Sequence, residues 1–112
     1  MTIAKSMTPI EEAFHKDMLA VHDNVGRSTG YWPRRFLQKV KRSGGVMSAK
    51  YWLAKNGVSE GFKRLSEEKK LEFSTEVLIL RAEYKGLFSD EEQAIARKRL
   101  EDYGYSQKPL AD

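Results

Sequence analysis

The sequence PRRFLQKVKRSGGVMSAKYWLAKNG, from Pro33 to Gly57, predicts two helices joined by a tight glycine turn. Proline suits the first position of a helix, because its missing N–H would have no partner there. The double glycine ends the first helix, and Asn-Gly ends the second. We therefore expect helices over residues 33–43 and 46–55.

Capping signals predict further helices on both sides of this pair. The sequence Thr8-Pro9-Ile10-Glu11 fits a capping box, and it predicts a helix over residues 9–24 that Gly26 and the Ser-Thr-Gly cluster after it terminate. The apolar residues of this helix recur every three or four positions, as in a helix with one buried face. They are Ile10, Phe14, Met18, Val21 and Val25.

Three serines cap the helices expected in the second half of the chain. Ser59 precedes a short helix over residues 60–65, and Ser89 begins a helix that should end at Tyr103, before Gly104. Ser74 precedes a segment that is apolar on nearly every side as far as Ala82, which indicates a central helix. We predict an all-α fold: one compact domain of five to six short helices over residues 8–105, with flexible termini at 1–7 and 106–112.

The composition agrees with one small globular domain. Of the 112 residues, 40% are hydrophobic and 32% are charged, which separates the chain from disordered proteins. It contains no run of about 20 apolar residues and no secretory signal, so we expect no membrane partner and a cytoplasmic location. Its lack of cysteine excludes disulfides and thiolate metal ligands.

The charges of the chain are segregated. No acidic residue lies between Asp23 and Glu60, although eight of the 20 lysines and arginines do. Such segregation usually indicates a partner of opposite charge. On a helical wheel the cations of residues 33–43 lie opposite Phe36 and Val40, where they can contact phosphates. The predicted nucleic-acid or partner-binding residues are Arg34, Arg35, Lys39, Lys41, Arg42, Lys50, Tyr51 and Lys55.

Other interpretations of this block stay open. Cationic helix faces often serve only for solvation. The two helices also resemble a helix-turn-helix, in which the second helix would present Met47, Lys50, Tyr51 and Lys55 for base reading. Tyr31, Trp32 and Tyr51 are candidates for stacking on unpaired bases.

Arg99 falls on the inward side of the last predicted helix. A guanidinium there needs a carboxylate or a route to water. We predict a structural ion pair with Glu76, which begins the most apolar helix.

No motif for catalysis, metal binding or cofactor binding occurs in the sequence. His15 and His22 are about 10 Å apart along one helix, too far to share a metal ion easily. Gly44-Gly45 could hold a phosphate, but a helix stop explains it. We therefore expect no enzyme, no cofactor and no metal.

Several segments together resemble a small uncharacterised all-helical family of bacterial and prophage proteins, some of them encoded near restriction-type genes. The similarity covers residues 14–105 and lies in Tyr31-Trp32-Pro33-Arg34-Arg35-Phe36-Leu37, Gly44-Gly45, Ser59-Glu60-Gly61-Phe62, Ser74-Thr75-Glu76, Leu87-Phe88 and Ala96-Arg97-Lys98-Arg99-Leu100. It implies a helical fold in a defence or mobile-element setting. It implies no activity and assigns no functional residue.

These observations favour a non-enzymatic accessory or regulatory module that binds DNA or RNA through the basic helix face. The alternative is a protein-binding module, such as a phage-encoded inhibitor of a nuclease-based defence system of anti-CRISPR or anti-restriction type. Its basic face would then dock on an acidic or nucleic-acid-binding protein surface. A third hypothesis is an assembly protein that oligomerises through exposed aromatic residues. The sequence leaves the oligomeric state open.

Overall fold

The computed structural model describes residues 7–105, which are helical and contain no strand. The all-α prediction is therefore confirmed for this part of the chain. The predictions for residues 1–6 and 106–112 lie outside the described residues. The six α-helices are α1 (Pro9–Thr29), α2 (Arg34–Ser43), α3 (Gly45–Leu53), α4 (Glu60–Glu67), α5 (Thr75–Ile79) and α6 (Asp90–Asp102), and two 3-10 helices, η2 (Leu71–Phe73) and η3 (Ala82–Leu87), flank α5.

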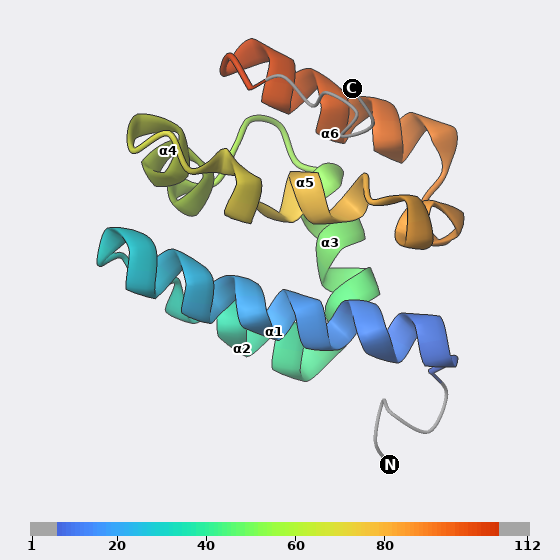
Figure 1. Cartoon of the computed structure of the whole chain (residues 1–112). Helices are drawn as coiled ribbons and strands as arrows, with labels where there is room; N and C mark the ends of the chain where they lie inside the picture. The colour runs from blue at the N-terminus through green and yellow to red at the C-terminus, as the bar shows by residue number, and fades with distance from the viewer. Residues whose placement is uncertain (1–6, 106–112) are drawn as a thin grey trace.

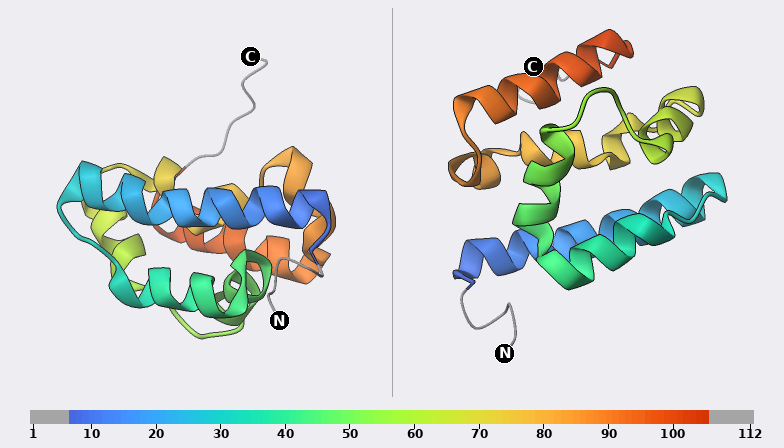
Figure 2. Two further views of the ribbon diagram at one scale, coloured as in Figure 1. Left: turned by 90° about the horizontal axis from the view of Figure 1, so that it is seen from below. Right: turned by 180° about the vertical axis from the view of Figure 1, so that it is seen from behind.

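The helices form two layers that α3 connects (Figure 1). Helices α1 and α2 lie side by side in one layer, as the view from below shows, and α4, α5 and α6 form the other (Figure 2). Helix α3 runs across the space between the layers and packs against α1, α2 and α6. The core lies between the layers and includes Phe14, Met18, Val40, Ala49, Ile79 and Ala96, all with no exposed surface.

Every predicted capping serine or threonine caps a helix. Thr8 and Ser89 form complete capping boxes with Glu11 and Glu92. Ser59 and Ser74 each accept a hydrogen bond from the backbone N–H three residues ahead. These starts were predictable because both partners of each cap lie within one turn.

The first helix is longer than the predicted residues 9–24, because Gly26 does not end it and Gly30 of the predicted Ser-Thr-Gly cluster does. Helix α1 continues through Gly26 to Thr29 and ends at Gly30, whose φ of 82° is left-handed. A Cβ atom at residue 26 would lie 2.1 Å from the Trp32 ring, which folds back over the helix. Gly26 therefore provides space for an aromatic side chain, and a packing contact explains it better than a helix stop.

The central helix is shorter than the sequence predicts. Helix α5 ends at Ile79, and the backbone becomes extended at Arg81 before the 3-10 helix η3 begins. Asp17 of α1 lies beside this break, where it accepts a hydrogen bond from the Tyr84 hydroxyl at 2.6 Å and lies 3.6 Å from the Arg81 guanidinium. The apolar residues of α5 are nevertheless central, as predicted, because Leu78 and Ile79 are buried.

We expect the contact between Tyr84 and Asp17 to be visible in an alkaline titration. Burial, the hydrogen bond to Asp17 and its negative charge raise the pKa of Tyr84 from 10.0 to about 12. Absorbance of phenolate should therefore show one component near pH 12 that Tyr84→Phe removes. Because the folded-state pKa is raised, the associated stability is complete below pH 10.0 and is lost as the pH rises through about 12. The prediction fails if the titration component that disappears in Tyr84→Phe lies near the ordinary tyrosine pKa of 10.0.

None of the helices within residues 7–105 is both long and apolar enough to span a membrane.

Candidate nucleic-acid interface

The cations of α2 form a broad outer face. At 100° per residue, the arc from Lys41 through Arg34 and Arg42 to Lys39 covers about 160°. Val40 lies on the opposite side, where it is fully buried. Arg34, Arg35, Lys41 and Arg42 are all exposed, and within residues 7–105 none of these four forms an ion pair.

Tyr51, near the C-terminal end of α3, extends the cationic face of α2 onto the neighbouring helix. The ammonium of Lys39 lies 4.1 Å from the centre of the Tyr51 ring, and that of Lys55 lies 5.0 Å from it. The ring is 44% exposed, so it holds two cations beside a surface that a ligand can reach. We use the term basic surface for Arg34, Arg35, Lys39, Lys41, Arg42, Tyr51 and Lys55.

Lys50 differs from the other predicted binding residues. Its ammonium donates a 2.8 Å hydrogen bond to Glu92 of α6, and it is partly buried. Burial of Glu92 acts to raise the pKa of this carboxyl. The hydrogen bonds from Lys50 and from the Ser89 N–H outweigh burial and hold the pKa below its usual value. Lys50 is therefore neutralised by a carboxylate 42 residues away in sequence, and we leave it out of the basic surface.

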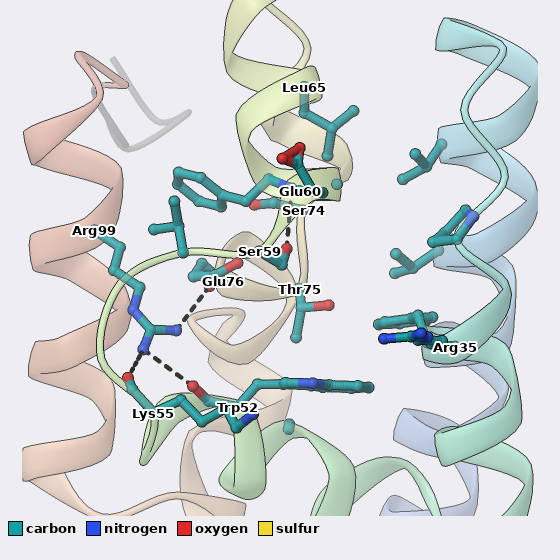
Figure 3. A pocket seen from close by; sticks show the side chains of 18 of the residues that line it. Arg35, Trp52, Lys55, Ser59, Glu60, Leu65, Ser74, Thr75, Glu76 and Arg99 are labelled. Atoms are coloured by element: carbon teal, nitrogen blue, oxygen red, sulfur yellow. Dashed lines mark hydrogen bonds and ion pairs between the residues drawn. The ribbon is translucent and has the colours of Figure 1, made fainter.

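A cleft of about 660 Å³ opens beside the basic surface, between α2 on one side and α4 and α5 on the other. Figure 3 shows Arg35 on one wall, Ser59, Ser74, Thr75 and Glu76 on the opposite wall, and Trp52 across the base of the view. Arg34, Arg35 and Lys55 line both the cleft and the basic surface. The two features are therefore continuous.

Arg99 and Glu76 form the predicted pair at the inner end of this cleft. The guanidinium of Arg99 lies 3.2 Å from the Glu76 carboxylate, and the two side chains are only 11% and 10% exposed. Arg99 also donates to the backbone carbonyls of Trp52 and Lys55 at 3.0 and 2.7 Å (Figure 3). It thus adds hydrogen bonds to carbonyls at the C-terminal end of α3, of which that of Trp52 also accepts from the Lys55 N–H at 3.2 Å. The sequence did not reveal this role.

Burial raises the pKa of Glu76, and the positive charge and hydrogen bond of Arg99 act against this effect. Because the guanidinium already serves the carboxylate and two carbonyls, it has a structural role, and we assign it no part in ligand chemistry.

The histidines are engaged within the fold. His15 Nδ1 accepts a 3.0 Å hydrogen bond from the Gly45 N–H, while His22 lies 3.0 Å from Asp23 and packs against Trp32. No group of three or more potential metal-binding side chains occurs in the part of the chain that the structure describes.

The aromatic side chains divide into two groups. Trp32 is 47% exposed and Tyr51 is 44% exposed, whereas Tyr31 is half-buried with the Arg64 guanidinium over its ring. Phe36 and Trp52 stack in parallel, with centroids 5.0 Å apart and an interplanar angle of 8°. Both rings line the cleft, which the sequence did not predict.

No protein-family model, curated protein or solved structure matches this chain. The resemblance to a prophage family therefore stays a prediction.

Proposed function

We propose that this protein is a non-enzymatic nucleic-acid-binding module and that its basic surface contacts the phosphate backbone of DNA or RNA. The main support is the set of four exposed cations on one face of α2 that have no carboxylate partner within residues 7–105. Solvation alone is a weaker explanation, because surface cations that serve only solvation are usually interspersed with carboxylates. The phage or defence setting is part of the proposal and rests on the family resemblance alone.

Salt dependence tests this proposal directly. Binding to phosphates releases counterions, so affinity for duplex DNA should fall with a log–log slope of about −0.9 for each phosphate contacted. Fluorescence anisotropy with labelled duplex and single-stranded oligonucleotides, starting at about 50 mM salt, would measure the slope where charge screening is weakest. Absence of binding to every oligonucleotide at that salt concentration would refute the proposal.

Replacing Arg34, Arg35, Lys41 and Arg42 together with alanine is expected to remove most of the affinity and to reduce the salt slope by about 3 to 4. Helical circular dichroism should be unchanged, because all four side chains are exposed. The matched control replaces Lys16, Lys63, Lys85 and Arg97, which are exposed cations on other helices, and so removes the same total charge. Equal losses in the two variants would mean that net charge, and not this surface, drives binding.

A protein partner is the second candidate, because Met47 is 62% exposed on α3, one turn before Tyr51. Exposed methionine and tyrosine are typical of protein interfaces. This candidate, which includes the inhibitor hypothesis, is favoured if oligonucleotides do not bind while a partner copurifies from the native host and is lost on replacing Met47 and Tyr51 with alanine.

A further inference from the structure

The cleft beside the basic surface has the size and lining of a small-ligand site. Its volume of about 660 Å³ falls within the 300–1,000 Å³ that is usual for such sites. The walls are mainly apolar and come from all six α-helices. The apolar lining residues include Val21, Val25, Phe36, Trp52, Phe62 and Ile79.

The stacked rings of Phe36 and Trp52 favour a flat ligand. Their parallel arrangement fixes the orientation of two aromatic planes at the cleft wall. Flat heterocycles stack on aromatic side chains with gains of about 1 to 3 kcal/mol for each base. An aliphatic ligand would fill the same volume without using this geometry.

The wall opposite Arg35 offers hydrogen-bonding groups (Figure 3). The hydroxyl oxygens of Ser59 and Ser74 accept from the N–H groups of Phe62 and Val77, which leaves the hydroxyl hydrogens able to donate. The Thr75 hydroxyl and the Glu76 carboxylate lie on the same wall. Donors and an acceptor on one wall of an apolar cleft fit a ring with a mixed polar edge, as a nucleobase has.

The lining of the cleft also carries positive charge. Arg34, Arg35 and Lys55 are among the lining residues, and none has a carboxylate partner within the described residues. Glu60 is the one exposed carboxylate among the lining residues. A ligand that places a flat ring inside would therefore be favoured if it also carried an anionic group that can reach these cations.

We propose that the cleft binds one unpaired nucleobase, with the phosphate of the same nucleotide at Arg34, Arg35 and Lys55. This inference rests on the proposed function, which it extends: the basic surface follows the backbone, and the cleft receives a base that is not in a duplex. The nucleotide can come from a single strand or from free solution. A base in a duplex cannot enter without leaving its stack, so the site favours single strands.

The tryptophans provide a direct measurement in the unmodified protein. Trp32 and Trp52 are the only tryptophans of the chain, and both line the cleft. Nucleoside monophosphates should quench the tryptophan fluorescence in a saturable way, whereas inorganic phosphate, which lacks the base, should not. If free nucleotides quench the fluorescence and bind more tightly than single strands do, the ligand is a free nucleotide. If single strands bind more tightly than free nucleotides, the ligand is a strand.

Gly61 offers a way to block the cleft. A Cβ atom there would lie 3.7 Å from the Tyr31 ring and 3.9 Å from the Ser59 hydroxyl, which are ordinary contacts. Gly61→Leu should therefore fold and should fill part of the cleft, because Gly61 lines it. The matched control is Gly86→Leu, since no atom lies within 4 Å of a Cβ at this exposed position.

We expect Gly61→Leu to weaken binding of nucleotides and single strands by at least about tenfold, which corresponds to the loss of one stacked base. Duplex binding should be unchanged, and Gly86→Leu should behave as the wild type.

A second variant combines Lys41→Ala with Arg42→Ala, two residues of the basic surface that do not line the cleft. It should weaken duplex binding but spare the binding of single nucleotides. Absence of quenching by nucleotides, with salt-dependent oligonucleotide binding intact, overturns the cleft assignment and leaves the basic surface standing. Absence of both kinds of binding overturns both.

Discussion

Replacing Arg99 with methionine is expected to lower the free energy of unfolding by about 3 to 5 kcal/mol, because it leaves the buried Glu76 carboxylate without its cation. The same change removes the hydrogen bonds that Arg99 donates to the carbonyls of Trp52 and Lys55 at the end of α3. The loss of these charge-assisted hydrogen bonds adds to the cost. Urea denaturation followed by helical circular dichroism would measure the effect.

Two variants control for this result. Arg97 is an exposed arginine on the same helix, so Arg97→Met should change the stability by less than about 0.5 kcal/mol. Combining Glu76→Gln with Arg99→Met removes the unpaired charge and should recover part of the loss. If Arg99→Met costs no more than Arg97→Met, the ion pair does not stabilise the fold.

The loss in Arg99→Met should also depend on pH. Burial already raises the pKa of Glu76 above its usual 4.5, and removing Arg99 takes away an effect that lowers it. A carboxyl with a raised folded-state pKa contributes stability that is present below its unfolded value and lost as the pH rises through the folded value. The deficit of Arg99→Met relative to the wild type should therefore be larger at neutral pH than near pH 4, and Glu76→Gln in the double variant should abolish this difference.

The sequence predicted those features of the fold that depend on neighbouring residues. The capping boxes at Thr8 and Ser89 consist of hydrogen bonds between residues three positions apart. A short stretch of sequence therefore contains both partners. Apart from the Arg99–Glu76 pair, contacts between distant segments were not predicted. Trp32 packs over Gly26 in the middle of the last turns of α1, while Asp17 contacts the segment in which α5 gives way to η3.

The same division applies to the candidate site. The cations of α2 were predictable because their spacing places them on one helix face. The pairing of Lys50 with Glu92 spans 42 residues and was missed. Glu76 was identified as the partner of Arg99 from burial patterns, but the carbonyls of α3 that Arg99 also binds were not. The cleft was missed altogether, because its lining comes from separate helices and no single segment contains its signature.

Helices α1 and α3 approach each other closely at Gly45, where the sequence indicated only a helix boundary. A Cβ atom there would lie 2.7 Å from the Cα of His15 and 3.2 Å from the Met18 side chain. The Gly45 N–H also donates to His15 Nδ1 at 3.0 Å. The contact at 2.7 Å is with a backbone atom of a long helix, so rotating a side chain cannot relieve the clash.

Replacing Gly45 with alanine is therefore expected to destabilise the protein by about 3 kcal/mol, at the upper end of the usual cost of overpacking. Helix propensity alone predicts that the same change would stabilise the protein. Gly45 is the first residue of α3 and its φ is not positive, so alanine would otherwise favour the helix by up to about 1 kcal/mol. Gly61→Ala is the matched control, since it also lies near a helix start and its Cβ would make only ordinary contacts. Denaturant unfolding should show Gly45→Ala well below the wild type and Gly61→Ala at or above it. A gain in stability for both variants would contradict the prediction. It would mean that the backbones of α1 and α3 leave room for a Cβ at residue 45, and that the double glycine is needed only for the turn.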